Sequence, residues 1–349
     1  MRKNMAIVVD RLDSALGIAA NRRAKIVNAD VIGIVNFRSP KHFFEFLELK
    51  EYDFMVFSWR RGLLEAMSSN GFRNFIARNR HKTKIGLVIA DYLGLEKRYL
   101  DQERSLINYV DGYWTTNHDL FAKYSHIQGV QNPIGVLHDI PDFESIERIR
   151  NRTIKKRKII WVGNSNWGVN YGFHDYKGFH EIIEPVFEKA KRTLKNYEFC
   201  IIDSKKNPMN NLEVLMHIAE SKIILQASVN EGTGLPLLEG LGLGTIPIST
   251  DVGVASELLT GNFKQLLVAR NFLDFEEKIL EIVNEDSEKF NKINEMFDYH
   301  ISKIVKESMK FIPVTKNDQY AGNKNLSNYL KNLLLWNYRY YKSRKSHEN

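Results

Sequence analysis

Short apolar runs alternate with longer amphipathic stretches through the first half of the chain. The runs have the length and residue types of buried strands, and they span residues 5–9, 31–36, 53–58, 84–89 and 112–116. Helical patterns over residues 19–28, 41–50 and 62–79 separate them. This alternation predicts a doubly wound α/β domain built on a parallel sheet.

The second half of the chain continues the same alternation. Apolar runs over residues 158–163, 199–202 and 222–228 predict further buried strands. Residues 244–259 are typical of a tight turn, a short buried strand that ends at Ser249, and the start of another helix. With 349 residues, of which 43% are hydrophobic, the chain can bury two cores of ordinary domain size.

Two carboxylates, Glu231 and Glu239, bracket a glycine-rich turn and the opening of an apolar helix. Pro236 suits the first turn of that helix, because its missing N–H costs nothing there. If the helix begins near Leu235, its free N–H groups face the carboxyl end of the preceding strand, where open α/β sheets bind anions. A diphosphate is the expected occupant, and the carboxylates would accept hydrogen bonds from sugar hydroxyls. The alternative is that both glutamates are solvated surface groups.

Residues 221–259 resemble the C-terminal domain of retaining GT-B glycosyltransferases of the family-4 type. The signature of that family is a Glu-x7-Glu pair followed by a small, glycine-rich helix and a Gly-x-Pro strand. Upstream, residues 158–163 resemble the first strand of that domain, residues 175–179 its Lys-Gly helix start, and residues 210–225 the helix and strand before the signature. The resemblance covers about residues 155–285 and implies a GT-B fold, with two doubly wound Rossmann-like domains facing across a cleft.

The resemblance also implies roles for individual residues. Glu231 would contact the donor sugar, Glu239 would hold the nucleotide ribose, and Lys177 would neutralise the diphosphate. The remaining donor contacts are expected from the amides of the turn and from the loop after the first strand, namely Thr233, Gly234, Leu235, Gly163, Asn164 and Ser165. Many relatives carry an arginine directly after that first strand's glycine, whereas this chain has Asn164. The predicted site therefore lacks one of the positive charges expected beside the leaving diphosphate.

Polar residues also follow the predicted strands of the first half, where the open-sheet rule places a crevice. These cleft candidates are Asp10 and Arg11, residues 58–61, Asp91 and Tyr92, and Asn117 and His118. Family relatives often have a histidine near the reacting sugar, but the comparable position here holds Ala90 and Asp91, so Asp91 is the candidate catalytic residue on this side. Asn117 and His118 are equally compatible with helix capping and packing.

Short metal-binding motifs are absent from the sequence. It contains no Asp-x-Asp, no His-x-His, no Glu flanked by histidines at helical spacing, and no P-loop. We therefore expect no metal and no cofactor other than the nucleoside-diphosphate sugar that serves as donor substrate. The resemblance implies retention of the anomeric configuration.

We expect three regions: an acceptor-side Rossmann-like domain over residues 1–152, a nucleotide-sugar-binding Rossmann-like domain over residues 153–312, and a helical tail over residues 313–349 that could cross back to the first domain. The single cysteine, Cys200, has no partner for an intrachain disulfide, which fits a reducing compartment. No apolar stretch reaches the eighteen residues or so of a membrane span. Cytoplasmic residence is the default expectation.

A formal net charge of +8 and a pI near 9.2 suggest anionic partners. The charge concentrates in residues 148–158 and in residues 336–345, where aromatic side chains interleave with cations. Such segments suit anionic lipids at the inner membrane face or a nucleic-acid backbone. They are also compatible with a solvated linker and with a last helix that packs through Leu326, Leu330, Leu333 and Leu334.

Three functions remain open at this stage. The first is a retaining transferase that moves a sugar to a glycan or lipid-linked acceptor in surface polysaccharide synthesis, with peripheral contact to the membrane. The second is a transferase that modifies nucleic acid. The third is a GT-B-like partner subunit that binds without turnover, which the missing arginine and histidine would suit and which Glu231, Glu239 and Lys177 argue against.

Overall fold

The computed structural model describes residues 4–12, 14–37, 40–79, 81–92, 97–150, 152–169, 172–285, 290 and 293–310. Its strands are short and mostly buried: β1 Met5–Val9, β2 Asp30–Gly33, β3 Phe54–Phe57, β4 Lys84–Ile89, β5 Gly112–Thr115, β6 Gly135–Val136, β7 Lys158–Gly163, β8 Glu198–Asp203, β9 Ile223–Gln226 and β10 Ile246–Ser249. They form one sheet in the order β2-β1-β3-β4-β5-β6 and a second in the order β10-β9-β7-β8. Strand pairings in both sheets are parallel.

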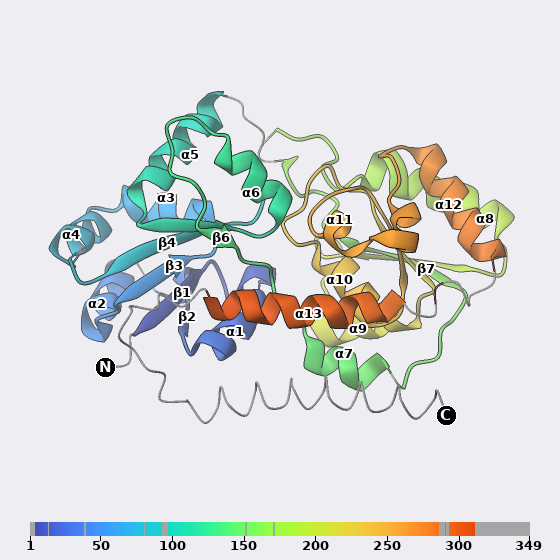
Figure 1. The fold of residues 1–349 in the computed structure, drawn as a ribbon, viewed down its shortest axis with the longest axis horizontal. Helices are drawn as coiled ribbons and strands as arrows, with labels where there is room; N and C mark the ends of the chain where they lie inside the picture. The colour runs from blue at the N-terminus through green and yellow to red at the C-terminus, as the bar shows by residue number, and fades with distance from the viewer. Residues whose placement is uncertain are drawn as a thin grey trace. The chain divides into compact units, whose positions relative to one another are not determined.

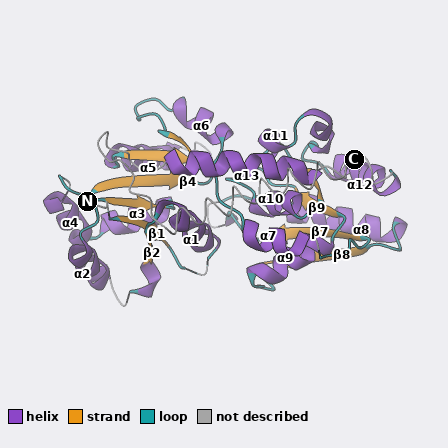
Figure 2. Cartoon of the chain, turned by 60° about the horizontal axis from the view of Figure 1, so that its bottom comes forward, coloured by secondary structure: helices purple, strands orange, loops and turns teal. Residues whose placement is uncertain are grey.

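Helices connect these strands, as parallel pairing requires. The helices are α1 Ala15–Val27, α2 Pro40–Lys50, α3 Arg60–Ser68, α4 Asn70–Asn79, α5 Lys97–Tyr109, α6 His118–Ser125, α7 Phe143–Arg150, α8 Glu184–Thr193, α9 Asn211–Glu220, α10 Leu235–Gly242, α11 Ala255–Leu258, α12 Phe272–Asn284 and α13 Ile293–Lys310. Shorter helical turns are η1 Ile34–Asn36, η3 Phe179–Ile183 and η4 Gly261–Leu266. Figure 2 shows the orange strands of both sheets flanked by purple helices. The predicted α/β class with two parallel sheets is confirmed.

The chain divides into two compact units. The first comprises the described residues within 4–88, 110–112 and 301–310, and the second comprises those within 89–109 and 113–300. The candidate donor-site residues, from Gly163 to Glu239, belong to the second unit, and so does Asp91, the catalytic candidate from the first half of the sequence. The predicted domain boundary near residue 152 stays a prediction, and the predicted tail over residues 313–349, with its leucines and its basic aromatic end, lies outside the described residues.

The second sheet has a core of isoleucine and leucine. Ile159, Ile160, Ile223, Ile224 and Ile248 are each at most 1% exposed. Helix α8 packs against α12 and helix α7 against α9, and Figure 1 shows the two pairs on opposite sides of β7. Because the strands are parallel, their carboxyl ends lie at one edge of this sheet. The glycine-rich loop between β9 and α10 lies at this edge.

Two local predictions from the first half were wrong. The strand predicted over residues 31–36 ends at Gly33 and gives way to the 3-10 turn η1, in which Val35 is 61% exposed. The single helix predicted over residues 62–79 is two helices, α3 and α4, because Ser69 adopts an extended backbone with ψ of 129°. The serine, asparagine and glycine residues at 68–71 favour such a break over a continuous helix.

Three lysines of the basic segment at residues 148–158 make contacts within the protein, while most cations of the segment are exposed to solvent. Lys155 donates to the carbonyl oxygen of Ser221 at 2.9 Å, and Lys156 pairs with Glu220 at 2.6 Å. Lys158 is 2% exposed and lies 3.4 Å from Glu198. The interpretations of this segment as a solvated linker, or as a binding surface for lipid or nucleic acid, stay predictions.

Arg150 makes the most buried ion pair of this segment. Its two terminal nitrogens lie 2.9 and 3.2 Å from the carboxylate of Asp298, and its Nε donates to the carbonyl oxygen of Gly242. Burial raises the pKa of Asp298 despite the guanidinium beside it. The fold therefore depends on Arg150 to keep a buried carboxylate compensated.

We expect Arg150→Met to lower the free energy of unfolding by about 3 to 5 kcal/mol at neutral pH, because Asp298 stays buried without its cation. The pKa of Asp298 would rise further above its unfolded value in this variant. In acid, protonation of Asp298 would remove the cost of burying its charge. The free energy of unfolding of the variant would therefore fall as the pH rises from about 4 to 7. Urea denaturation across this pH range measures both effects.

Arg148→Met is the matched control, because Arg148 lies on the same helix, is exposed, and contacts only the Ser145 hydroxyl among the described hydrogen bonds, at 3.3 Å. Its unfolding free energy should follow that of the parent at each pH. Equal losses in the two variants would contradict the role given to Arg150.

Candidate functional site

The glycine-rich loop, residues 231–234, leads directly into helix α10. Gly234 caps the helix with a φ of 76°, and Pro236 lies in its first turn, as predicted. A Cβ on Gly234 would lie 2.7 Å from Oε1 of Gln226, so glycine is needed for both its backbone angle and its lack of a side chain. Among the described residues, the structure gives no acceptor to the backbone N–H groups of Thr233, Gly234 and Leu235. These amides can bind an anion.

An ion pair between Lys177 and Glu231 lies beside this loop. Lys177 Nζ is 2.5 Å from Glu231 Oε1, and the Ser228 hydroxyl donates to the same oxygen at 2.6 Å. The two charged side chains are 17% and 15% exposed. Lys177 Nζ also lies 5.5 Å from the centre of the Trp167 ring, in the range of a cation–π contact. The structure thus brings together the two residues that the resemblance assigned to sugar and diphosphate.

A tight turn positions Lys177. The next residue, Gly178, has a φ of 67°, and a Cβ there would overlap the carbonyl oxygen of Ala227. Arg270 donates to that same carbonyl at 3.0 Å and to the carbonyl oxygen of Asp175 at 2.7 Å. The guanidinium therefore joins the turn before Lys177 to the end of the β9 segment.

Asn117 holds the glycine-rich loop from the other side. Its side chain is fully buried, and its Oδ1 accepts the Leu120 N–H at 2.7 Å, which caps helix α6. Its Nδ2 donates to the carbonyl oxygens of Glu231, at 3.0 Å, and Gly232. The sequence offered Asn117 as either a cleft residue or a helix cap; the structure confirms the cap and adds the contact with the loop, while the cleft role stays a prediction.

The segment that contains Asp91 also lies against this loop. A Cβ on Gly232 would overlap the carbonyl oxygen of Ala90, and the Tyr176 hydroxyl contacts the carbonyl oxygen of Tyr92 at 3.4 Å. Asp91 lies between these two contacts and is half-buried. The structure therefore places its backbone beside the loop, while its catalytic role stays a prediction.

Glu239 and Thr233 are both buried. Glu239 is 4% exposed within helix α10, which excludes its interpretation as a solvated surface group. The Thr233 hydroxyl lies 3.1 Å from Oδ2 of Asp139 and accepts the Asp139 N–H at 3.0 Å. Asp139 follows β6, and the sequence gave no signal for this contact because 94 residues separate the partners.

The loop after β7 is fixed by Asp203. Ser165 is 3% exposed, and its hydroxyl and its N–H donate to the Asp203 carboxylate at 2.6 and 3.3 Å. Burial opposes the ionisation of Asp203, but the hydrogen bonds from Ser165 and Lys205 outweigh it and lower its pKa. The Ser165 proton is thus directed at Asp203 rather than at a ligand, and Gly163 and Asn164 remain the half-buried members of this loop.

The sequence matches a known protein family in part, and the fold is similar to several solved structures. Residues 204–297, about a quarter of the chain, match the family described as glycosyl transferases group 1. Among solved structures, the GtfA/B complex is 15% identical with a TM-score of 0.53 and 78% of this chain covered. A mutant of TarM from S. aureus, bound to fondaparinux, alpha-GlcNAc-glycerol and UDP, is 15% identical with a TM-score of 0.55 and 77% covered. The chain spans only 59% and 56% of the length of these two proteins.

A third solved structure matches over nearly its full length. HepE from Anabaena, in complex with UDP, is 13% identical with a TM-score of 0.60, covering 88% of this chain and 98% of that one. No curated protein sequence matches the chain. These findings establish the GT-B fold and support a glycosyltransferase, and residues 204–297 contain both glutamates of the predicted signature.

We expect Gly178→Ala to destabilise the protein by about 3 kcal/mol, from left-handed strain together with a clash against Ala227. Gly172→Ala is the matched control, because Gly172 has a φ of 82° but nothing lies within 4 Å of an added Cβ. It should cost only the strain, about 1 kcal/mol. Urea denaturation compares the two, and equal costs would contradict the close contact under the Lys177 turn.

Proposed function

We propose that the protein is a retaining glycosyltransferase that moves a sugar from a nucleoside-diphosphate donor to a glycan or lipid-linked acceptor. The observation that carries this proposal is the start of α10, where three backbone amides have no acceptor among the described residues and follow Glu231, whose carboxylate pairs with Lys177. Amides and a lysine together suit a diphosphate. The UDP bound to TarM and to HepE supports a nucleotide donor.

In this proposal each donor contact has a chemical reason. The amides of Thr233, Gly234 and Leu235 bind phosphate oxygens, and Lys177 neutralises their charge. Glu231 accepts hydrogen bonds from sugar hydroxyls, which its second oxygen can do while Oε1 contacts Ser228. Glu239 is assigned to the ribose, and its burial in α10 suits a specific hydrogen bond rather than general solvation.

The reaction exchanges two bonds at the anomeric carbon. The bond from this carbon to the phosphate oxygen breaks, a bond to the acceptor oxygen forms on the same face, and the acceptor proton passes to a phosphate oxygen of the departing nucleoside diphosphate. The fixed amides and Lys177 stabilise the charge on that leaving group. In this scheme the donor chemistry requires no metal, and Glu231 acts by positioning rather than as a nucleophile.

Lys177 has to be shared between Glu231 and the donor. A diphosphate carries more negative charge than a carboxylate, so it would compete with Glu231 for the ammonium group. The exchange would free an oxygen of Glu231 for a sugar hydroxyl. Donor binding therefore replaces one ion pair by another, and the net charge of the site stays compensated.

The acceptor side is assigned from sequence. We propose that residues 1–152 select the acceptor and residues 153–312 bind the donor, with Asp91 as the candidate catalytic residue on the acceptor side. None of the described helices is long and apolar enough to cross a membrane. The basic aromatic segment at residues 336–345 is the feature that favours a membrane-facing acceptor.

We expect Lys177→Gln to weaken binding of a nucleoside diphosphate about 10-fold to 100-fold, since one charge-assisted contact is lost. Isothermal titration against a panel of nucleoside diphosphates measures this. Lys189→Gln is the matched control, because Lys189 is half-exposed and pairs with Glu276 at 2.7 Å between helices α8 and α12. The affinity of the Lys189→Gln variant for nucleoside diphosphates should equal that of the parent.

Two results would count against the proposal. If no nucleoside diphosphate binds to the parent, the chain is better described as a non-catalytic partner subunit. If the diphosphates bind but Glu231→Ala transfers sugar as fast as the parent, the role of Glu231 is wrong.

We expect the full chain to float with vesicles that contain anionic lipid and not with neutral vesicles, and to dissociate as salt is raised. The comparison is gel retardation of DNA at the same two salt concentrations. Retention of DNA without flotation would favour the nucleic-acid-modifying transferase instead.

A further inference from the structure

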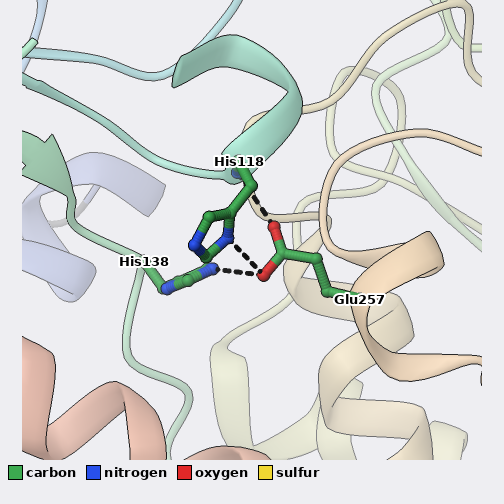
Figure 3. Close-up of side chains that lie close together, drawn as sticks. All are labelled: His118, His138 and Glu257. Atoms are coloured by element: carbon green, nitrogen blue, oxygen red, sulfur yellow. Dashed lines mark hydrogen bonds and ion pairs between the residues drawn. The ribbon is translucent and has the colours of Figure 1, made fainter. Parts of the chain in front are cut away.

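Three side chains that are far apart in the sequence converge in the second unit. His118 begins α6, His138 follows β6, and Glu257 lies in α11, and Figure 3 shows both imidazole rings directed at one carboxylate. Glu257 Oε2 lies 2.9 Å from His118 Nδ1 and 3.0 Å from His138 Nε2. Its other oxygen accepts the backbone N–H of His118 at 2.9 Å. The backbone contact fixes the carboxylate so that a single oxygen faces both rings.

The cluster is enclosed on one side and open on the other. The His138 side chain is fully buried, Glu257 is 15% exposed, and His118 is 50% exposed. The His138 ring also lies against His118 and His300, with ring centres 5.8 and 5.2 Å away. Burial by itself would raise the pKa of Glu257, but the hydrogen bonds from His118 and His138 outweigh it and hold the pKa below its usual range. The carboxylate is therefore ionised.

We propose that His118, His138 and Glu257 bind a divalent transition-metal ion of the zinc type. The three ligand atoms lie within 4.8 Å of one another, and two imidazole nitrogens with one carboxylate oxygen are ligands that zinc, cobalt and nickel favour over magnesium or calcium. Tetrahedral zinc with bonds of about 2.0 to 2.1 Å separates its ligands by about 3.3 Å. The two nitrogen–oxygen separations, 2.9 and 3.0 Å, need to open by only a few tenths of an ångström, and the two ring nitrogens lie within 4.8 Å of each other. A rotation of the half-exposed His118 ring can adjust these separations.

The fourth coordination position would face the exposed side, beside His118, and take water or a small ligand. The bound ion would replace the hydrogen bonds that now join the three side chains. It would join the start of α6, the segment after β6, and α11 through coordinate bonds.

Residues near each of the three ligands contact the glycine-rich loop. Asn117 donates to the carbonyl oxygens of Glu231 and Gly232, Asp139 contacts Thr233, and a Cβ on Gly253 would lie 2.9 Å from Cβ of Glu231. Each contact comes from a residue within four positions of a proposed ligand. The ion would therefore stabilise the loop through these neighbouring residues, without contacting the donor. Its binding can be measured without any nucleotide.

The test is a titration of the full chain, freed of metal by a chelator, with Co²⁺ as a spectroscopic probe and Zn²⁺ as competitor. We expect one equivalent of cobalt to give the visible absorption of a tetrahedral site and zinc to displace it. His118→Gln and Glu257→Gln should each weaken binding at least about 10-fold. Zinc should raise the melting temperature of the parent and not of these variants.

His174→Gln is the control, because His174 is 86% exposed and also lies beside a carboxylate, Glu181, at 3.2 Å. It should bind cobalt like the parent. Absence of a cobalt complex in the parent, or equal binding in parent, His118→Gln and Glu257→Gln, would overturn the proposal and leave the cluster as a hydrogen-bonded contact. Because His118 is half-exposed, its variant tests the site even if Glu257→Gln fails to fold. The result is independent of nucleotide binding, so it stands or falls separately from the proposed transferase activity.

Discussion

The second unit depends on one buried amide, that of Asn117. A fully buried side-chain amide needs partners for its oxygen and for its N–H groups, and here they come from the start of α6 and from the carbonyls of Glu231 and Gly232. These partners lie more than 110 residues apart along the chain. Because an unsatisfied amide would be costly, the loop cannot move away from α6 without loss. The position of Glu231, and through it of Lys177, follows from that constraint.

Glycines make the same arrangement possible from the backbone side. Gly232 lies against the carbonyl of Ala90, Gly234 against Gln226, and Gly178 against the carbonyl of Ala227. Only Gly234 and Gly178 have a positive φ, so Gly232 is needed for space alone. The loop therefore approaches two different segments with its backbone, and the turn after Lys177 approaches a third.

The sequence predicted what depends on local pattern. Strands β1, β4 and β7 begin and end at the predicted residues, because buried parallel strands are short apolar runs with polar ends. The start of α10 was also predictable, since Gly234 and Pro236 restrict the backbone there. The break between α3 and α4 was missed because the apolar spacing continues across Ser69. Asn117 could only be placed after a strand, and the contacts of Asp139, His138 and Glu257 were beyond prediction, because they join residues about 90 to 120 positions apart without any spacing motif.

The missing arginine after Gly163 can be understood from the same contacts. An arginine at position 164 would add a cation next to Ser165, whose hydroxyl and amide are held by the Asp203 carboxylate. Lys206 already lies 4.0 Å from that carboxylate. The loop is therefore fixed by neutral donors and a lysine, and the cation paired with the glycine-rich loop is Lys177, through Glu231. Since Lys177 is paired with Glu231, a ligand has to offer more negative charge than one carboxylate to displace it, which favours a diphosphate over a neutral sugar or a monoanion.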